Sequence, residues 1–436
     1  MLKKPINEIA AELNARLSEN GCAALSMLSA KGARAFFPSR GILGQSAEAK
    51  GTEINATIGT AKEDDGSPLC LECIEEMLNA PSDAFLYAPS AGLADLRHAW
   101  RDGQIRKNPG LSGKRFSLPV VTHALTHALY LAGQLFLDKG DKLILPDLYW
   151  DNYELLFAEG CGAVFTPFKT FAGQKYNVPA LRRKLLSAGE KKVLLLNFPN
   201  NPTGYTVTTD EAYAIRDAVR EAAEAGKKVV VLIDDAYFGL VYEEGVFPES
   251  VFSLLANLHE NVMAVKLDGA TKEDYVWGLR VGFITFGMKG LSDSQYGALE
   301  AKAAGLVRAT ISSASHIGQR MLLLAYGMDC YPAQKAEKFA TLKNRYAIIR
   351  KILAAHPEYR ASFTAMPFNS GYFMCVKPNG VDAESLRRHL LKHHRTGTIM
   401  LSGLLRLAFS SVPADKLEKL FANIDAAVRE LKGAAK

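Results

Sequence analysis

The sequence predicts an α/β fold, in which a mostly parallel sheet lies between helices and a smaller α+β lobe follows it. Three observations predict this arrangement. The middle of the chain alternates apolar runs with helical patterns, the alternation ends near residue 315, and 436 residues are too many for one small domain. Strands that alternate with helices form parallel sheets, because each crossover helix returns the chain to the same edge.

Six apolar runs are the expected strands of the sheet. They cover residues 141–147, 162–168, 191–198, 227–237, 261–269 and 279–287. Continuous apolar runs of this length are typical of strands that are buried on both faces. Between the third and fourth runs, Thr208–Glu211 fits a capping box, which predicts that a helix begins there.

The smaller lobe is expected to combine both ends of the chain. Beyond residue 315, two long helical patterns precede two short strand-like runs, 371–378 and 404–410, and a closing helix. The first residues have an amphipathic pattern rather than that of a cleavable leader. We therefore predict an N-terminal part of the small domain (1–60), a large domain (61–315) and a small C-terminal domain (316–436).

Composition narrows the classes of function. Hydrophobic residues make up 48% and charged residues 22% of the chain, which is the balance of a globular protein with a large core. The net charge of +6 is modest, and the densest basic run, 386–395, is typical of a solvated helix face. We expect no nucleic-acid partner. No window has membrane-spanning length, and the six scattered cysteines are typical of a cytoplasmic protein.

Reactive side chains follow three strands of the predicted sheet. Asn201 follows one strand, and Asp234 and Tyr237 follow the next. Lys272 follows the third. Ligands of parallel sheets bind beyond the carboxyl ends of the strands, so an amide, a carboxylate, a phenol and an amine are expected at one edge. Each alone is better explained as a cap or a loop residue, but together they suit pyridoxal 5′-phosphate, which needs an amine for a Schiff base and an acid beside its pyridine nitrogen.

Over roughly residues 50–415 the chain resembles class I aminotransferases, fold-type I pyridoxal-phosphate enzymes of the aspartate aminotransferase superfamily. Four motifs carry the resemblance: YAPSAGLADLR (87–97), NNPTG (200–204), DDAY (234–237) and KEDYVWGLRVG (272–282), which reads as K-x5-G-x-R-x-G. The resemblance implies a large domain with a seven-stranded, mostly parallel sheet.

The resemblance also implies a role for each motif residue at the cofactor. Lys272 matches the Schiff-base lysine, and Arg280, eight positions later, matches a phosphate ligand. Asp234 matches the partner of the pyridine nitrogen. Tyr237 and Asn201 match the hydrogen-bond partners of the ring oxygen.

Four further residues are assigned by their positions relative to the family pattern. Trp150 falls where the family stacks an aromatic ring on the pyridine. Tyr87 falls where a tyrosine reaches the phosphate in the partner subunit, which implies a homodimer with shared active sites. Arg406 matches the arginine that binds the substrate α-carboxylate through a bidentate pair. Gly59 matches the glycine whose backbone amide faces the same carboxylate.

The phosphate is expected at the start of a helix, whose N–H groups and dipole suit an anion. Ala124 and Leu125 stand where the family usually has glycine or serine, so backbone amides are expected to bind there, and Thr126 adds a hydroxyl. His123 and His127 have helical spacing but lack the glutamate of a zinc-protease motif. We therefore expect no metal.

Two departures from the family pattern concern the site. The family often has serine or threonine three positions before the lysine as a phosphate ligand, and Gly269 stands there. Either this contact is lost or another hydroxyl, such as that of Thr271, replaces it. The stretch before Arg406 is shortened and lacks the valine-proline-glycine segment that often lines the substrate pocket. The resemblance is therefore weakest for side-chain specificity.

One arginine bears on the substrate. In dicarboxylate-specific members, an arginine four residues before a serine crosses the dimer interface to bind the distal carboxylate of the substrate. Arg308 and Ser312 have this spacing. An ordinary surface or interface arginine is the alternative, because the prolines that the family often places after the serine are absent here.

These assignments predict a transaminase, in which Lys272 moves the Cα proton of an amino donor and a 2-oxo acid is released. Glutamate with 2-oxoglutarate is the expected common pair by family analogy, and dicarboxylic or aromatic amino acids are expected as the other substrate. Two alternatives stay open. A pyridoxal-phosphate lyase that catalyses β-elimination begins with the same carbanion. A non-catalytic regulatory protein would need a DNA-binding unit, and the first 50 or so residues have no helix-turn-helix pattern.

Overall fold

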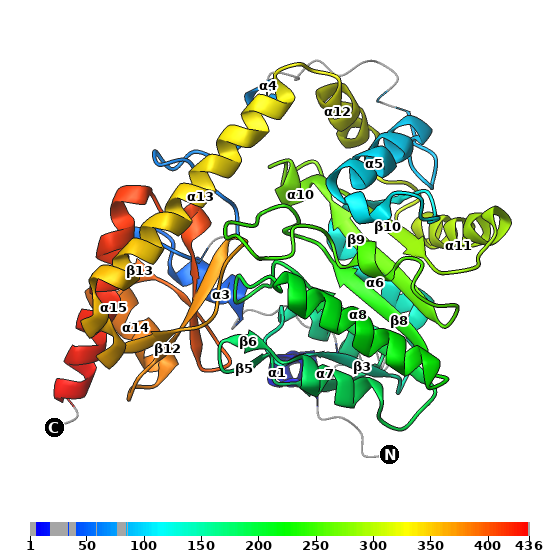
Figure 1. Ribbon diagram of the computed structural model, residues 1–436. Helices are drawn as coiled ribbons and strands as arrows, with labels where there is room; N and C mark the ends of the chain where they lie inside the picture. Colours follow the sequence, from blue (N-terminus) through cyan, green and yellow to red (C-terminus); the bar gives the residue numbers. More distant parts are fainter. Residues whose placement is uncertain are drawn as a thin grey trace.

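The computed structural model describes residues 6–17, 34, 41–57, 59–75, 84 and 86–434. A seven-stranded sheet forms the large lobe, and a four-stranded sheet forms the small lobe beside it (Figure 1). The strand order of the large sheet is β2-β10-β9-β8-β7-β3-β4. Only β10 runs antiparallel to its neighbours. The predicted mostly parallel sheet is confirmed.

The strands of the large sheet agree with the predicted runs. They are β2 (Val120–His123), β3 (Lys142–Pro146), β4 (Val164–Phe168), β7 (Lys191–Asn197), β8 (Lys228–Asp234), β9 (Val262–Gly269) and β10 (Val281–Gly287). All but β2 lie inside the six apolar runs. The four residues of β2 are too few to give a clear apolar run of their own.

Hydrophobic cores cover both faces of this sheet, as continuous apolar strands require. In β7, Val193 and Leu195 belong to one core, and Leu194 and Leu196 belong to the other. Helix α6 (Ala124–Phe136) packs in the first core. Helices α7 (Val178–Leu185) and α8 (Thr209–Glu224) pack in the second. The expected capping box opens α8 through Thr208 and Glu211.

The small lobe is an antiparallel sheet with the order β11-β12-β15-β14. Its strands are β11 (Phe363–Ala365), β12 (Phe373–Pro378), β14 (Ile399–Leu401) and β15 (Leu404–Ala408). It carries the helices α14 (Ala383–His393) and α15 (Leu417–Ala434). The two predicted strands correspond to β12 and β15, and the three-residue strands β11 and β14 were not predicted.

The N-terminal segment contacts the small lobe through a short strand and a helix. Strand β1 (Ile54–Asn55) pairs in parallel with β13 (Thr396–Gly397). Helix α3 (Ile42–Glu48) is fixed by Gln45, whose side chain bonds both backbone groups of Met400. Near the start of the chain, α1 (Glu8–Leu17) lies where the amphipathic pattern predicted a helix.

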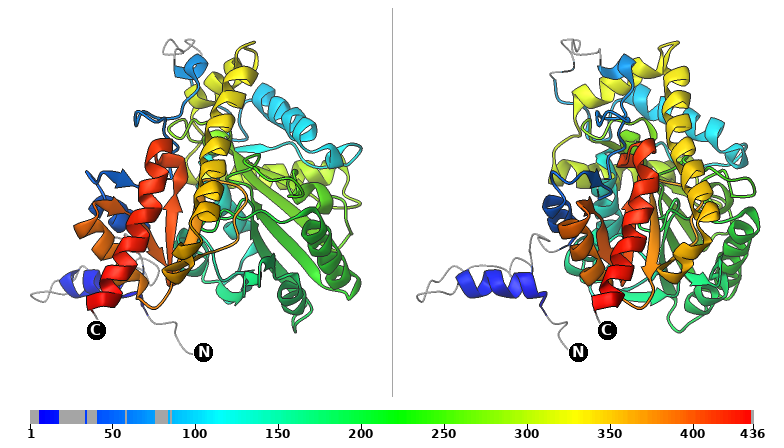
Figure 2. Two further views of the ribbon diagram at one scale, coloured as in Figure 1. Left: turned by 60° about the vertical axis from the view of Figure 1, so that its left-hand side comes forward. Right: turned by 90° about the vertical axis from the view of Figure 1, so that its left-hand side faces the viewer.

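Three of the remaining described helices also frame the two lobes. Helix α5 (Ala94–Lys107) and helix α11 (Asp293–Thr310) lie beside the β2–β10 edge of the large sheet. Helix α13 (Tyr331–Ala355) runs from the large lobe along the small one (Figure 2). Within the described residues, no helix is both long enough and apolar enough to cross a membrane.

Candidate active site

A cavity of about 360 Å³ lies at the carboxyl ends of β7 and β8, between the two lobes. Most of the residues that the sequence assigned to a site line this cavity. They are Gly59, Ala124, Leu125, Thr126, Trp150, Asn201, Asp234, Tyr237, Lys272, Arg280 and Arg406. The loops that follow parallel strands lie at the same edge of the sheet. Residues that are far apart in the chain, such as Asn201, Asp234 and Lys272, therefore meet in this cavity.

Asp234, the last residue of β8, is a buried carboxylate at the base of the cavity. Its Oδ2 accepts a hydrogen bond from the hydroxyl of Tyr153, and its Oδ1 accepts one from the N–H of Ala236 at 3.0 Å. Burial raises the pKa of Asp234, while both hydrogen bonds favour the ionised form. A cation in the cavity beside Asp234 would offset the cost of burying this charge.

Lys272 lies on the short helix α10 (Ala270–Glu273), directly after β9. Its Nζ is 4.9 Å from the centroid of the Tyr237 ring. Removal from water lowers the pKa of Lys272 to about 8; Asp234 opposes this shift, and Arg280 adds to it. An amine with such a pKa is partly neutral at physiological pH and can accept a proton.

Arg406, on β15, is a buried guanidinium that forms no ion pair within the described part of the chain. Its Nη1 donates to Asn201 Oδ1 at 2.9 Å, and its Nη2 donates to the carbonyl of Thr57 at 3.2 Å. The guanidinium stacks on Phe373, 4.3 Å from the ring centroid, and its Nε has no partner among the described residues. A buried cation with a free donor that faces a cavity is suited to a carboxylate ligand.

The NNPTG loop fixes Asn201 through backbone contacts. The N–H of Asn201 donates to Asn197 Oδ1 at 2.8 Å, and the side chain of Asn197 donates to the carbonyl of Asp234 at 2.9 Å. Gly204 has φ +71°, and a Cβ there would meet the Phe373 carbonyl at 1.8 Å. Only glycine allows this approach to β12, so the loop holds the Asn201 amide beside both Asp234 and Arg406.

The opposite end of the cavity is formed by the start of α6. The N–H groups of the first helical turn have no acceptor within the helix. Ala124 (φ 60°) and Arg280 (φ 55°) both have left-handed backbones, and the Ala124 N–H donates to the Arg280 carbonyl at 2.9 Å. A Cβ on Gly282 would lie 2.5 Å from the Ala124 carbonyl carbon. This glycine therefore allows β10 to bring Arg280 against the helix start.

The hydroxyl of Thr271 also belongs to this end of the cavity. It is buried, and Oγ1 has no hydrogen-bond partner within the described chain. A buried donor without a partner is costly, so a ligand oxygen at this position would satisfy it. Together with the Arg280 guanidinium and the helix start, it makes a cradle for an anion. Asp234, which forms no ion pair within the described chain, and this cradle lie at the two ends of one cavity and fit a pyridinium that carries a phosphate.

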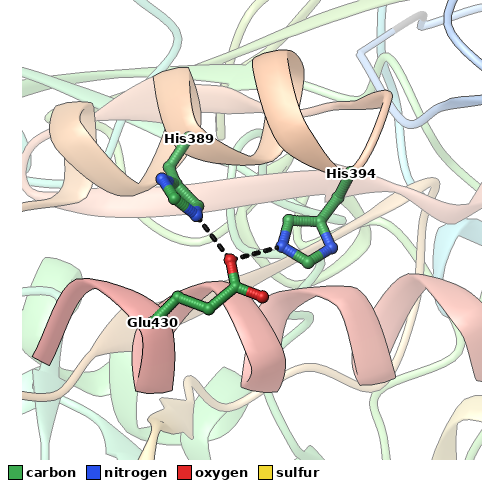
Figure 3. Close-up of side chains that lie close together, drawn as sticks. All are labelled: His389, His394 and Glu430. Atoms are coloured by element: carbon green, nitrogen blue, oxygen red, sulfur yellow. Dashed lines mark hydrogen bonds and ion pairs between the residues drawn. The ribbon is translucent and has the colours of Figure 1, made fainter. Parts of the chain in front are cut away.

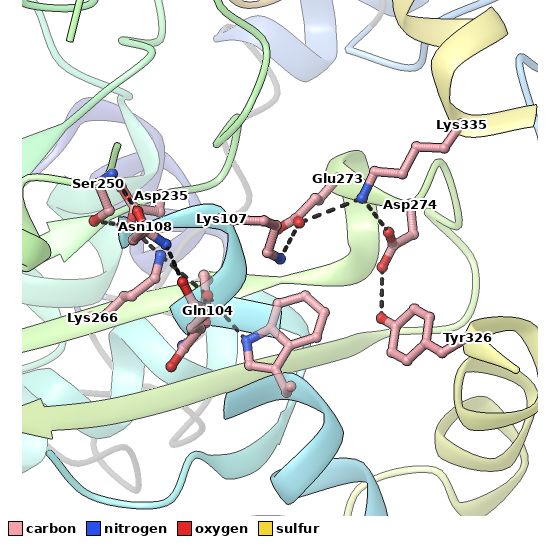
Figure 4. A network of polar contacts seen from close by, with 12 residues as sticks. Gln104, Lys107, Asn108, Asp235, Ser250, Lys266, Glu273, Asp274, Tyr326 and Lys335 are labelled. Atoms are coloured by element: carbon pink, nitrogen blue, oxygen red, sulfur yellow. Dashed lines mark hydrogen bonds and ion pairs between the residues drawn. The ribbon is translucent and has the colours of Figure 1, made fainter. Parts of the chain in front are cut away.

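The residues that follow Asp234 and Lys272 are held by buried charge networks (Figure 4). Asp235 points away from the cavity and bonds Lys266 and Ser250. Glu273 pairs with Lys107 and Lys335. These networks fix the backbone on either side of the two cavity-facing groups.

The same network of charged and polar side chains extends to helix α13, which runs from the large lobe along the small one. Lys335, on α13, bonds Asp274 Oδ1 at 2.8 Å, and Tyr326 bonds Asp274 Oδ2 at 2.8 Å (Figure 4). The segment that carries Lys272 is therefore tied to the helix that spans both lobes.

Two predicted site residues do not line the cavity of their own chain. Tyr87 is 91% exposed. Arg308, near the end of α11, is exposed, and its Nη1 donates to Ser312 Oγ. The two segments touch, because Ser90 Oγ donates to the Ser312 carbonyl at 2.9 Å. Both side chains are therefore exposed on the protein surface, and the two segments that carry them contact one another.

Sequence reasoning missed several residues of the cavity. Tyr153 lies near Trp150, and Asn197 precedes the NNPTG loop. Both side chains donate hydrogen bonds to Asp234, Tyr153 to its carboxylate and Asn197 to its carbonyl, and the sequence does not reveal these contacts. Trp150, which was assigned, packs edge-on against Tyr153 with ring centroids 5.6 Å apart. Ile42 and Ser46 enter from α3, and no motif marks them.

Comparison with known proteins decides the family. The family model described as "Aminotransferase class I and II" matches residues 52–424. The chain belongs to this aminotransferase family. Its members are enzymes that use pyridoxal 5′-phosphate, and the cavity described above fits that cofactor.

Curated relatives and solved structures agree with this membership. An aspartate aminotransferase of Bacillus sp. (strain YM-2) is 28% identical over 204 residues, which are 45% of this chain and 47% of that protein. A probable aspartate/prephenate aminotransferase of Aquifex aeolicus is 28% identical over 233 residues, 49% of this chain and 56% of that protein. The matched segments thus span about half the length of these relatives.

The fold is shared with solved aminotransferase structures. An aminotransferase from Anaerococcus prevotii superimposes with a TM-score of 0.80 at 24% identity, covering 92% of this chain and 98% of that one. An aspartate aminotransferase from Thermus thermophilus gives a TM-score of 0.71 at 21% identity, with 92% and 99% covered. The predicted fold type I architecture is confirmed.

Proposed function

We propose that this protein is an aminotransferase that moves an amino group between an L-amino acid and a 2-oxo acid. The observation that carries this proposal is the joining of three groups in one cavity: the Lys272 amine, the Asp234 carboxylate and the Arg406 guanidinium. An amino acid offers a Cα proton, which Lys272 would accept, and an α-carboxylate, which Arg406 would bind, while Asp234 would pair with the pyridine nitrogen of the cofactor.

The residues at the two ends of the cavity would hold pyridoxal 5′-phosphate. Asp234 would pair with the pyridine nitrogen, and Trp150 would lie against the ring. The phosphate would contact Arg280, Thr271 and the start of α6 with Thr126. Tyr237 and Asn201 would bond the ring oxygen. When bound, the cofactor supplies an electron sink for negative charge that develops at the substrate Cα.

Lys272 and Arg406 would act on the substrate. Lys272 Nζ would hold the cofactor in the resting enzyme and take the Cα proton as a neutral base, which its lowered pKa of about 8 favours. Arg406 would grip the α-carboxylate, and the Gly59 amide lies on the same wall. Asn201, bonded to Arg406 at 2.9 Å, keeps the guanidinium oriented.

We further infer that one substrate pair is glutamate with 2-oxoglutarate and that the active unit is a homodimer. The names of two relatives, aspartate aminotransferase and probable aspartate/prephenate aminotransferase, support dicarboxylic substrates. Exposed Tyr87 and Arg308 support a shared site, because each would then reach the cavity of the partner subunit.

A donor screen tests the proposal. Purified enzyme with pyridoxal 5′-phosphate is given single L-amino acids with 2-oxoglutarate or pyruvate, and the new amino acid and the new 2-oxo acid are both quantified. Equal amounts of the two products are expected. Ammonia released in step with a 2-oxo acid, without a new amino acid, would instead identify a lyase. The absence of any product with every donor would contradict both.

A further inference from the structure

Two histidines and a glutamate converge on the surface of the small lobe, and none of the three lines the active-site cavity. His389 lies on α14, His394 follows its last residue, and Glu430 lies on α15 (Figure 3). The Nε2 atoms of both histidines contact the same oxygen, Glu430 Oε2, at 2.6 and 3.0 Å. All three potential ligand atoms lie within 4.8 Å of one another.

This arrangement is close to that of three ligands around one ion. Zn²⁺ binds histidine nitrogen and carboxylate oxygen at about 2.0–2.2 Å in tetrahedral geometry, which separates neighbouring ligand atoms by roughly 3.3 Å. The imidazoles are 19% and 15% exposed, whereas the Glu430 side chain is 49% exposed and has room to turn. A small rotation of the carboxylate would open the space for an ion between preset imidazoles.

Neighbouring contacts fix the position of His394 and bring the two rings together. His394 directly follows α14, and its carbonyl accepts from Thr396 Oγ1 at 2.9 Å. The rings of His389 and His394 have centroids 5.8 Å apart. Arg387 and Arg388, on the same helix, donate hydrogen bonds to Glu384. The carboxylate of Glu384 thus engages these two positive charges.

A second histidine–glutamate cluster shows what a non-chelating arrangement looks like. His356 bonds Glu358 through Nδ1 at 2.7 Å and Glu418 through Nε2 at 2.8 Å. Because the two carboxylates lie on opposite sides of one ring, they share no point at which an ion could bind all three groups. This cluster is therefore a matched control within the same lobe.

We propose that His389, His394 and Glu430 form a binding site for a divalent transition-metal ion of the Zn²⁺ type. Imidazole and carboxylate suit Zn²⁺, and the fourth position is open to water. Binding replaces the hydrogen bonds between Glu430 and the two rings with metal–ligand bonds and releases any protons that the ligand atoms carry. The ion would tie the end of α14 to the C-terminal helix α15, outside the active-site cavity.

The test is a Zn²⁺ titration of the untagged, chelator-treated holoenzyme against a chromogenic competitor. Wild type should bind one equivalent of Zn²⁺. The His389→Ala and His394→Ala variants should each bind Zn²⁺ at least about tenfold more weakly than wild type. Glu430→Gln should also weaken binding, and His356→Ala should leave it unchanged. Equal binding by wild type and the His389→Ala/His394→Ala double variant would overturn the proposal, as would an equal loss in His356→Ala.

Thermal unfolding gives an independent readout. An ion that binds only the folded chain raises Tm, so Zn²⁺ should raise the Tm of wild type and of His356→Ala but not that of Glu430→Gln, whereas Mg²⁺ should raise none. Glu430→Gln keeps a side chain of similar size and should fold, which its circular dichroism and transaminase activity would verify. A Zn²⁺-dependent rise of Tm in Glu430→Gln equal to that of wild type would contradict the site.

Discussion

Tyr153 donates its hydroxyl hydrogen to the carboxylate of Asp234, and both side chains are almost completely buried. Trp150 packs edge-on against the Tyr153 ring. The group that faces the cavity at the end of β8 is therefore oriented by a residue from the loop after β3. Because a neutral donor stabilises a carboxylate without cancelling its charge, Asp234 stays available to a cation in the cavity.

Tyr153→Phe should keep the fold and lose the hydrogen bond to Asp234. Hydrogen bonds to charged groups contribute about 1.5–3 kcal/mol, so kcat/KM should fall about 10- to 100-fold. Steady-state kinetics measures this loss. Tyr176→Phe is the matched control, because the buried hydroxyl of Tyr176 has no hydrogen-bond partner within the described chain, and its kcat/KM should stay within a factor of two or so. Equal kinetics in the two variants would remove Tyr153 from its positioning role.

Asp234→Ala should be more damaging, because it removes the proposed partner of the pyridine nitrogen. Removing one member of a buried charge pair costs about 3–5 kcal/mol, which corresponds to a drop in kcat of ~10²–10³ or more. Asp235→Asn is the comparison: it removes one of the two carboxylate partners of Lys266 and leaves Asp268 at 3.2 Å, so it should lower stability rather than the rate of the bound enzyme. If Asp234→Ala, with cofactor bound, loses less than about tenfold, another acid serves the ring.

The sequence predicts the large sheet well because its central strands are apolar on both faces, a signal that is local. The cavity residues that follow strand ends are predictable for the same reason. The role of Tyr153 is not, because its partner Asp234 is 81 positions away and nothing in PDLYWDNY indicates where the hydroxyl points. Ile42 reaches the cavity only because Gln45 anchors α3 to Met400, and such tertiary contacts leave no pattern in the chain.

Lys272→Met should abolish turnover and, without cofactor, stabilise the protein at neutral pH. The folded-state pKa of Lys272 is lowered from 10.5 to about 8, so the unfolded chain binds more protons between these values and wild-type stability rises with pH across that window. The shift corresponds to at most ~3 kcal/mol, and to less because cavity water still reaches the side chain.

Denaturant unfolding of the apoenzyme at several pH values checks this sign. The advantage of Lys272→Met over wild type should be fully present below about pH 8 and should vanish above about pH 10.4. Lys139→Met, at an exposed lysine, should show no such dependence. An advantage that is constant with pH would mean that packing, and not the buried charge, causes it.

Thr271→Val should change two properties in opposite directions. The variant removes a buried hydroxyl that has no partner among the described residues, so the apoenzyme should be as stable as wild type or slightly more stable. It also removes the proposed hydroxyl donor to the cofactor phosphate, so the Kd for pyridoxal 5′-phosphate should rise about tenfold or more. Thr398→Val is the control, because the Thr398 hydroxyl is also buried without a partner but lies outside the cavity. Cofactor titration that gives the same Kd for both variants would contradict the phosphate role of Thr271.

Arg308→Leu addresses the substrate. The exposed Arg308 bonds Ser312, on a surface patch that also carries Tyr87, and in a shared site it would reach the distal carboxylate of a substrate in the partner subunit. Loss of a buried, hydrogen-bonded charge contact costs roughly 2–5 kcal/mol, so kcat/KM for glutamate and aspartate should fall about 100-fold or more. The kcat/KM for alanine and for phenylalanine, which only Arg406 would bind, should change little.

Lys302→Leu is the control, because it removes an exposed charge from the same helix. It should leave the ratio of kcat/KM for glutamate to that for phenylalanine unchanged. If Arg308→Leu lowers both donors together, or neither, then Arg308 is an ordinary surface arginine and the dicarboxylate preference must come from another part of the pocket.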